Sequence, residues 1–553
     1  MARKVPKYKT LEIIFFDDED DKAAIEILEE IMRKSGGLNA FERYWIQDFG
    51  DGDRYFLDMV AERSKEEINE VLGGYFDRLK KRKQIDDWQP FDKSIIDLFV
   101  ENVDEINFNS LFSVTAQTMK ESYIRLLLAL LQEPDMISFA GGIPDPDAFP
   151  IETVGYLLNK KIMVKDDDFK KAKMALQYTG TAGIDLLRKQ TLEVADKTLK
   201  IKNQELDNII ITTGSQQALY GLSHILINKW DSIVVEAPTY LGALNPFKMH
   251  TSKFYSVDLR SNGPNVPQLV KILEKRHPKF VYLIPNFQNP SGVTTSKDVR
   301  EEIYDVVCKH NKEFTGSKKR YKTIIIEDDP YGSLRYEKKH IPSLKSMDTE
   351  DIVVYLGSFS KIFAPGIRVG CMIARKDIVE KLIGVKQSYD LHSSSFSQLL
   401  AYEFLAEGGH VSGHIKKIKK VYSEKMEAML NALDESGLRR FGFTYTRPEG
   451  GMFLWMTGPN NFNAKEILEN NLLNKEYMAD LNKRLKAENP KFKEFKNRVA
   501  FVPGEPFYAT DPKLNTARIN FSKPSIEEIK EGVRILSKVL PDSLGFFDKI
   551  ASD

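Results

Sequence analysis

The stretch IVVYLGSFSKIFAPGIRVGCMIA, residues 352–374, joins two apolar runs through a polar turn. Both runs are continuously apolar, which is typical of strands that are covered on both faces of a sheet. The connection is too short for a long crossover, so we expect one of the two strands to run antiparallel. The turn carries one lysine, Lys361, and one arginine, Arg368. They are either solvated charges on a loop or a site for an anionic ligand that reacts with the amine.

Outward from this stretch, short apolar runs alternate with helix-type segments, which indicates a mainly parallel sheet wrapped by helices on both faces. The predicted helices are residues 215–229, 267–276 and 297–312. The predicted strands are residues 208–213, 232–237, 253–259, 280–285, 323–328, 352–358 and 369–374. The fold class predicted is therefore α/β, with a seven-stranded, mainly parallel sheet in a large domain.

Beyond about residue 386 the pattern changes to long helices and a few strands, which indicates a second, smaller α/β domain. Its expected strands are residues 450–456 and 517–522, and its expected helices lie in residues 416–433 and 460–498. We predict four parts: an N-terminal extension over 1–105, an arm over 106–150, a large domain over 151–385 and a small domain over 386–553. The extension is expected to hold a strand at 10–16, a helix at 21–37 and a capping box at 64–67.

Composition limits the functional classes. The 553 residues carry 80 basic and 80 acidic side chains, so the whole surface is not built for nucleic acid, and acidic residues predominate in the first 100. Two cysteines provide neither a disulfide framework nor a zinc set, so no metal is predicted. No apolar run reaches the roughly 20 residues that a membrane span needs. We therefore expect a soluble cytoplasmic protein without membrane or nucleic-acid partners.

Polar and aromatic residues follow five of the predicted strands. They are residues 214–217, 238–240, 286–292, 328–332 and 358–361. Because ligands of open α/β sheets bind beyond the carboxyl ends of the strands, we expect these residues to meet in one site. The order of the strands thus predicts where the chemistry lies before any residue is given a role.

A reactive lysine must be desolvated or bonded to an aldehyde cofactor, since an ordinary protonated amine is no nucleophile. Pyridoxal phosphate combines such a bond with an anionic handle. It needs donors for its phosphate, a carboxylate at its pyridine nitrogen, donors for its phenolic oxygen and an aromatic ring over its face. The strand ends offer candidates for all four.

The phosphate candidates come from the start of a helix and from the quoted turn: Gly214, Ser215, Gln216, Ser358, Ser360 and Arg368. Any of three consecutive carboxylates, residues 327–329, can serve the pyridine nitrogen, and spacing alone does not choose between them. Asn289 and Tyr331 are candidate donors to the phenolic oxygen, and Tyr240 is the candidate ring.

At this point the chain resembles a fold-type I, class I/II aminotransferase. The motifs that carry the resemblance are TTGSQQAL, EAPTY, IPNFQNPSG, IIEDDPYG, GSFSKIFAPGIRVG, PEGGMFLW, FVPGEPFY and ARINFS, in the order of the family. They extend over roughly residues 107–540. Residues 122–150 and 176–188 resemble the branch of 2-aminoadipate, kynurenine and aromatic aminotransferases more closely. The stretches near residues 311–322 and 473–496 depart from the compact pattern of the family.

The resemblance implies roles for single residues. Lys361 would bond to the cofactor aldehyde and move the proton of the substrate α-carbon, and Asp328 would pair with the pyridine nitrogen. Together with Tyr331 they are the implied catalytic residues. Arg518 would bind the substrate α-carboxylate, helped by Asn289 and by the backbone of Gly142.

Two further roles reach beyond the cofactor pocket. Tyr178 would contact the phosphate of the neighbouring subunit, which makes a homodimer the smallest active unit and leaves a higher oligomer open. Arg125 lies in the segment that contacts the substrate side chain in the branch that this chain resembles. It is therefore the implied determinant of substrate specificity.

The resemblance implies a ping-pong transfer of an amino group from an L-amino acid, aromatic or 2-aminoadipate-like, to a 2-oxo acid such as 2-oxoglutarate. Two alternatives stay open. One is a transcription regulator built on an aminotransferase-like body, and the other is a lyase or decarboxylase reaction with the same cofactor.

Overall fold

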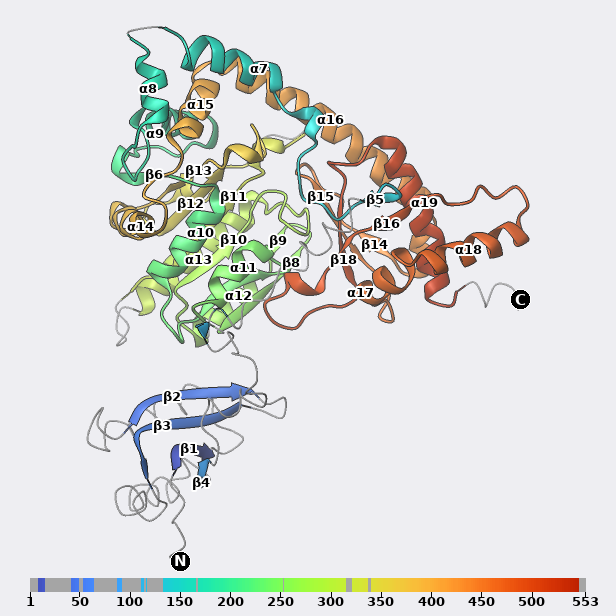
Figure 1. Cartoon of the computed structure of the whole chain (residues 1–553), viewed down its shortest axis with the longest axis horizontal. Helices are drawn as coiled ribbons and strands as arrows, with labels where there is room; N and C mark the ends of the chain where they lie inside the picture. The colour runs from blue at the N-terminus through green and yellow to red at the C-terminus, as the bar shows by residue number, and fades with distance from the viewer. Residues whose placement is uncertain are drawn as a thin grey trace, which may run out of the picture. The chain divides into compact units, whose positions relative to one another are not determined.

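The structure is a computed structural model that describes residues 133–546 except 166–167, 252, 315–320 and 337–339. Of the first 132 residues it describes four strands together with residues 111–113 and 116. The chain divides into two compact units, residues 1–120 and 121–553 (Figure 1). In the described part of the chain, no helix combines the length and the apolar character that crossing a membrane requires.

The first unit contains an antiparallel sheet in the order β2-β3-β1-β4. Its strands are β1 (Tyr8–Ile14), β2 (Phe41–Asp48), β3 (Asp53–Arg63) and β4 (Asp87–Phe91). The strand expected at 10–16 is therefore confirmed, while the helix expected at 21–37 and the capping box at 64–67 lie outside the described residues. The pairing makes β1 parallel to β2 across β3, and β3 parallel to β4 across β1. This is the strand arrangement of the split β-α-β-β-α-β motif.

The second unit is built on an eight-stranded sheet in the order β6-β13-β12-β11-β10-β7-β8-β9. The strands are β6 (Ile209–Thr212), β7 (Ile233–Ala237), β8 (Phe254–Arg260), β9 (Gly263–Pro264), β10 (Phe280–Leu283), β11 (Ile324–Asp329), β12 (Val353–Ser358) and β13 (Gly370–Ile373). All seven predicted strands are confirmed. The eighth, β9, is a two-residue addition that pairs with β8. As the short connection predicts, β13 runs antiparallel to both of its neighbours, β12 and β6.

Helices cover both faces of this sheet, because its strands alternate their side chains between two buried clusters. Ile210 and Met372 belong to one cluster, whereas Ile209 and Cys371, their neighbours in sequence, belong to the other. The first cluster is closed by α10 (Ser215–Leu226), α11 (Leu241–Lys248), α12 (Val266–Lys275), α13 (Lys297–Glu313) and α14 (Lys376–Tyr389). The second is closed by α7 (Ile151–Leu157), α8 (Lys170–Leu176), α9 (Asp185–Val194) and α15 (Ser395–Ala406). The three predicted helices correspond to α10, α12 and α13.

A smaller domain follows, built on an antiparallel sheet in the order β14-β15-β18-β17. Its strands are β14 (Thr444–Tyr445), β15 (Phe453–Thr457), β17 (Val502–Pro503) and β18 (Thr516–Asn520). Its helices are α16 (Gly408–Glu435), α17 (Ala464–Ile467), α18 (Lys475–Glu488) and α19 (Ile526–Ser543). The long helix α16 contacts α15 of the large domain at one end and packs on α19 of the small domain (Figure 1).

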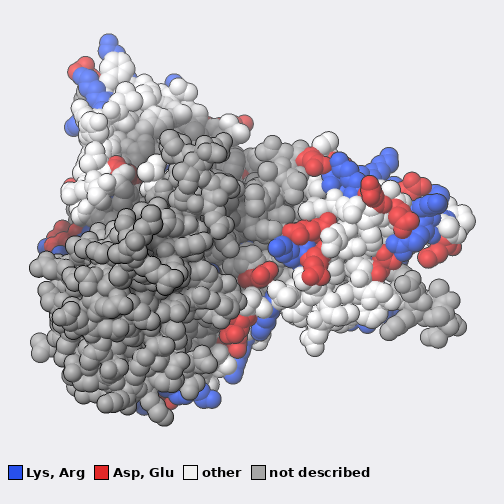
Figure 2. Space-filling model, turned by 60° about the horizontal axis from the view of Figure 1, so that its bottom comes forward, with Lys and Arg blue, Asp and Glu red and all other residues white. Residues whose placement is uncertain are grey.

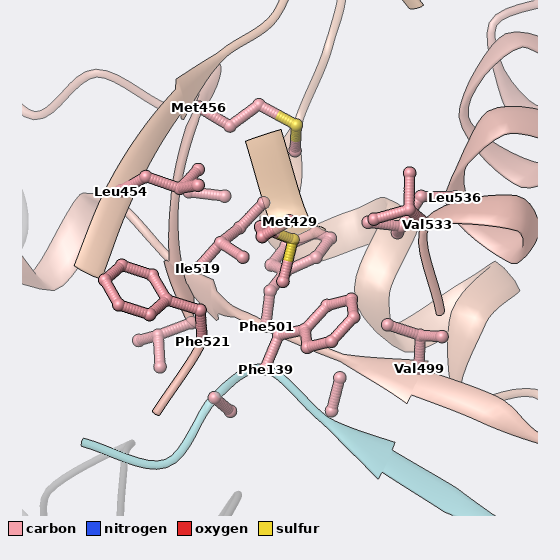
Figure 3. Packing of buried hydrophobic residues seen from close by; sticks show 14 of the residues in the cluster. Phe139, Met429, Leu454, Met456, Val499, Phe501, Ile519, Phe521, Val533 and Leu536 are labelled. Carbon is pink, nitrogen blue, oxygen red and sulfur yellow. The ribbon is translucent and has the colours of Figure 1, made fainter. Parts of the chain in front are cut away.

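The core of the small domain also includes a segment from far earlier in the chain. Strand β5 (Met136–Ser138) pairs in parallel with β16 (Arg498–Ala500), and Phe139 follows directly into the core. Figure 3 shows Phe139 among Val499, Phe501 and Ile519, which come from the opposite end of the sequence. This pairing fixes residues 136–142 beside β18, which carries Arg518.

Candidate active site

The carboxyl ends of β10, β11 and β12 lie side by side in the sheet. Asp328 is the fifth residue of β11, and Lys361 follows β12 by three residues. The turn after β12 continues through a single 3-10 turn, η11 (Pro365–Ile367), into β13. The short connection between two antiparallel strands thus holds Lys361 at the same sheet edge as Asp328.

The amine of Lys361 is partly buried and has one hydrogen-bond acceptor. Its Nζ donates a hydrogen bond to the carbonyl oxygen of Gly142, 3.1 Å away, and lies 6.0 Å from the centre of the Tyr331 ring. Burial lowers the pKa of Lys361 to about 8, with further lowering by the positive charges of Arg518 and Arg368. A substantial fraction of the amine is therefore neutral near physiological pH, which a nucleophile requires.

Hydrogen bonding separates Asp328 from the acidic residues on either side of it. The Glu327 carboxylate accepts hydrogen bonds from the Ser343 hydroxyl and from two backbone N–H groups, and Asp329 accepts from Asn286 and Tyr355. Asp328 accepts only from the Tyr282 hydroxyl, at 2.7 Å, and its buried Oδ1 has no partner in the described protein. Asp328 is therefore the one of the three with a free oxygen for a ligand.

The pKa of Asp328 reflects this incomplete environment. Burial raises it to about 7, while the hydrogen bond from Tyr282 opposes the rise and the charge of Asp329 adds to it. A cationic group placed against Oδ1 would stabilise the carboxylate and relieve the unfavourable burial. A protonated pyridine nitrogen is such a group.

Arg518 reaches the same pocket from β18 of the small domain. Its Nη1 donates to Asn289 Oδ1 at 3.0 Å and its Nη2 to the carbonyl oxygen of Ala140 at 2.9 Å, while its buried Nε has no partner in the described protein. The guanidinium carbon lies 4.5 Å from the centre of the Phe453 ring. Burial lowers the pKa of Arg518 to about 10, which still leaves the side chain charged at neutral pH. A buried cation with an unused donor is suited to a carboxylate ligand.

An anion cradle lies where β6 passes into α10. Gly214 has a φ of +74° and precedes the first turn of α10, whose free N–H groups favour an anion. The positive φ favours glycine there, and a Cβ at Gly214 would lie 2.6 Å from the guanidinium of Arg368, whose exposed side chain would have to shift. Ser358 Oγ accepts from the backbone N–H of Ser360 in the adjoining turn. Gly214 and Arg368 therefore lie together at the start of α10, where Ser215 is the first helical residue, while Ser358 and Ser360 are bonded to each other in the turn after β12.

Gln216 and Tyr240 both contact the backbone at the start of α11. The side-chain amide of Gln216 donates to the carbonyl oxygen of Gly242 at 2.6 Å, so that side chain is engaged with the start of α11. The Tyr240 ring folds over Gly242, where an added Cβ would lie 2.4 Å from it. The pKa of Tyr240 is raised by burial and by the charge of Asp328.

Tyr178, the residue implied at the subunit boundary, lies outside this cluster. Tyr178 is 77% exposed and packs edge-on against His392, with 5.7 Å between ring centres. Arg125 lies outside the described residues. Both assignments stay predictions.

The sequence did not point to two participants. Tyr282, which holds Asp328, stands inside the apolar strand run FVYLIP, and its hydroxyl is the polar signal that could have singled it out. The carbonyl oxygen of Ala140, which holds Arg518, is a backbone group and leaves no trace in the sequence. Asn289, which was predicted, links the two halves of the pocket by donating to the Tyr331 hydroxyl at 3.4 Å as well as accepting from Arg518.

The residues present fit pyridoxal phosphate. The unpartnered Oδ1 of Asp328 suits a protonated pyridine nitrogen, the Gly214 cradle suits a phosphate, and the partly neutral Lys361 suits an aldehyde. The described residues contain no group of three or more histidine, cysteine or acidic side chains that could hold a metal ion. Fold and site together define a fold-type I enzyme dependent on pyridoxal phosphate.

The comparisons with known proteins give the family. Residues 153–536 match the model of aminotransferase class I and II, so the chain belongs to this family and is a pyridoxal-phosphate-dependent amino-acid aminotransferase. It is 38% identical to aromatic-amino-acid aminotransferase 1 of Thermococcus litoralis, over 79% of this chain and 96% of that protein. It is 34% identical to 2-aminoadipate transaminase of Thermus thermophilus, over 79% of this chain and 98% of that protein.

Among solved structures, the chain is similar to Pyrococcus horikoshii kynurenine aminotransferase in complex with PMP, kynurenine and its product. The TM-score is 0.68 and the identity 36%, over 79% of this chain and 98% of the other. These findings confirm the predicted fold class, cofactor and reaction class.

Proposed function

We propose that this aminotransferase transfers the amino group of an aromatic or 2-aminoadipate-like L-amino acid to a 2-oxo acid, with 2-oxoglutarate as the usual acceptor, in a ping-pong reaction. The observation that carries the proposal is that Lys361 and Arg518, cations from different domains, both donate to the segment of residues 140–142, while Asp328 at a neighbouring strand end keeps a free oxygen. The names of the relatives support the choice of donors, since they include aromatic, 2-aminoadipate and kynurenine aminotransferases.

Each residue has a defined task in this reaction. When bound, pyridoxal phosphate supplies the electron sink that makes the α-hydrogen of an amino acid acidic. Asp328 holds a proton at the pyridine nitrogen, and Tyr282 keeps its carboxylate oriented by donating to Oδ2. Lys361 Nζ would take the proton from the α-carbon of the donor and deliver it to C4′ of the cofactor, the former aldehyde carbon. Arg518 orients the donor by holding its α-carboxylate.

The substrate side of the pocket combines charge with apolar surface. Phe453 and Phe507 lie within 5.2 Å of the guanidinium carbon of Arg518, and Tyr331 lies edge-on to Phe453. Aromatic walls beside a carboxylate clamp favour donors with large side chains. We assign Arg125 the part of receiving an acidic side chain, and of moving away for an aromatic one.

The active unit proposed is a cytoplasmic homodimer, with a higher oligomer open. Tyr178 is exposed on the subunit in which it lies, and exposed large apolar residues near it include Leu176 and Leu391. An apolar surface of this kind favours a partner subunit. In the dimer, Tyr178 would add its hydroxyl to the phosphate site of the other subunit.

A regulator that binds nucleic acid is the less favoured function. On the face drawn in Figure 2, the described basic and acidic side chains are interspersed and form no wide field of one sign. Nucleic-acid binding needs a basic stripe or patch. The unpartnered Asp328 Oδ1 and Arg518 Nε suit a cofactor and a substrate carboxylate, and catalysis needs both groups. A regulator does not need a complete catalytic site.

The test uses the full-length protein loaded with pyridoxal phosphate. L-2-Aminoadipate, aromatic amino acids, kynurenine and glutamate are added singly, and both the cofactor absorbance and the 2-oxo acid product are followed. We expect at least one aromatic or aminoadipate donor to yield one equivalent of 2-oxo acid and of pyridoxamine phosphate per site. Release of carbon dioxide or of ammonia without formation of pyridoxamine phosphate would instead establish a decarboxylase or lyase.

A further inference from the structure

A fully buried lysine, Lys386, lies on α14 against the start of α10. Its side chain is 0% exposed, and its Nζ donates to both carboxylate oxygens of Asp390 at 2.9 Å. The same amine donates to Gln217 Oε1 at 2.6 Å and to Ser393 Oγ at 3.1 Å. Burial lowers the pKa of Lys386, and the bond to Asp390 opposes this. None of the reaction steps above uses this pair.

The acceptors of Lys386 lead directly to the phosphate cradle. Gln217 Oε1 also accepts from the backbone N–H of Thr213 at 2.8 Å, and the Thr213 hydroxyl donates to Asp390 Oδ2 at 3.0 Å. Thr213 and Gln217 stand on either side of residues 214–216, the predicted anion donors. The carbonyl oxygen of Thr213 also accepts a long hydrogen bond, 3.5 Å, from Arg368. The pair thus holds Thr213 and Gln217, the residues at both ends of the cradle.

A second branch leads from the same pair to Tyr178. Ser393, which accepts from Lys386, has its carbonyl oxygen bound by the side-chain amide of Gln398 at 2.7 Å. The amide oxygen of Gln398 accepts from the backbone N–H of Ile184 at 2.9 Å, and Ser395 Oγ donates to the carbonyl oxygen of Gln177 at 2.7 Å. These bonds hold residues 177–184, the segment that carries Tyr178.

We propose that Lys386 is a positioning residue for the cofactor phosphate, acting through Gln217 and Asp390 on the cradle of its own subunit and through Ser393 on Tyr178. The proposal rests on the proposed function for the use of Tyr178 in a dimer. A purely structural ion pair would need no shared acceptors with the cradle. Here Asp390 and Ser393, two acceptors of the ammonium group, are each bonded to the Thr213 hydroxyl. The third acceptor, Gln217, is bonded to the Thr213 backbone and follows Gln216 of the cradle directly.

The test compares Lys386→Met with a control, Lys345→Met. Lys345 is 2% exposed at its side chain and pairs with Asp348 at 2.9 Å near the start of β12, so the control also breaks a buried pair. Apoprotein of the full chain is reloaded with pyridoxal phosphate, and the dissociation constant, the phosphorus-31 resonance of the bound cofactor and the melting temperature are measured. We expect both variants to melt lower, but only Lys386→Met to bind the cofactor about tenfold more weakly and to shift the resonance.

A second variant keeps the test decisive if the lone Asp390 charge prevents folding. Lys386→Met/Asp390→Asn restores charge balance in the buried site, so its melting temperature should recover while cofactor binding stays weak. Wild-type affinity and an unchanged resonance in this double variant, or an equal loss of affinity in Lys345→Met, would overturn the proposal. None of these readouts requires turnover, so they stand even if the proposed reaction fails.

The branch to Tyr178 is tested by a double-mutant cycle. Tyr178→Phe and Lys386→Met are each measured for cofactor affinity, alone and together. If Lys386 positions Tyr178, the combined loss will be smaller than the product of the single losses, by about threefold or more. If the two losses of cofactor affinity simply multiply in the double variant, Lys386 does not act through Tyr178.

Discussion

The turn that carries Lys361 and the strand that carries Arg518 each bring a cation into the pocket, but they hold it with different numbers of hydrogen bonds. Arg518 is buried and Lys361 partly buried, and burial lowers the pKa of each. Lys361 lies in a connection between two adjacent strands and has one hydrogen-bond partner, Gly142. Arg518 lies in a strand of the other domain and has two partners from two further segments. A reactive group is thus left loosely held, whereas a binding group is held on several sides.

The difference has a consequence for the reaction. A lysine that must react with an aldehyde and carry a proton needs a neutral form and freedom to move. A single hydrogen bond to the Gly142 carbonyl oxygen permits both. An arginine that must grip a carboxylate needs a fixed planar fork, which Asn289 and the Ala140 carbonyl oxygen supply. Substitutions on the two sides should therefore fail in different ways.

The largest effect is expected on the reactive side. Lys361→Ala removes the amine that donates to Gly142, and transamination should fall by about 10⁴-fold or more. Cofactor should still bind through the cradle, but without the absorbance that the lysine produces. Addition of a small primary amine should restore a measurable part of the rate. Persistence of the wild-type absorbance in this variant would show that Lys361 is not the lysine that bonds to the cofactor.

The next effect should fall on Asp328 and not on its neighbour. Asp328→Asn removes the charge that holds a proton at the pyridine nitrogen, so kcat should fall by about 10²- to 10³-fold with little change in melting temperature. Asp329→Asn disturbs the bonds from Asn286 and Tyr355, so the melting temperature should fall further. Steady-state kinetics gives kcat of the two variants, and calorimetry gives their melting temperatures. A loss of activity only in Asp329→Asn would move the pyridine contact to that residue.

A smaller loss is expected on the binding side. Arg518→Lys keeps the charge but loses the planar fork, so kcat/KM should fall by about 10²-fold. Cofactor affinity should not change, since the cradle lies on α10 and the β12–β13 turn. Titration with pyridoxal phosphate provides that control. A variant that binds cofactor weakly while keeping its KM would contradict the carboxylate assignment.

The fold and the cofactor side of the site could be predicted because they depend on chain order. Apart from Tyr178, which follows α8, the predicted cofactor residues lie at or near the ends of strands whose apolar runs are visible, and strand ends meet by geometry. The substrate side depends on contacts between distant segments. The pairing of β5 with β16, which brings Ala140 to Arg518, involves three residues from each strand and is too short to show a period. Spacing alone did not choose Asp328 over Glu327; the resemblance implied Asp328, and the hydrogen bonds of the two side chains support it.

The smallest expected effect links the two cations directly. The charge of Arg518 helps lower the pKa of Lys361 to about 8, so the rate at which apoprotein captures pyridoxal phosphate should rise about tenfold per pH unit below 8 and level off above it. Arg518→Gln removes that charge and should raise the pKa of Lys361, which moves the levelling-off to higher pH and slows capture at pH 7. Arg518→Lys keeps the charge and should leave the profile in place. Stopped-flow absorbance over pH 6–10 measures all three proteins. If Arg518→Gln and Arg518→Lys gave the same profile, burial alone would set the pKa of Lys361, and the two sides of the site would be electrostatically independent.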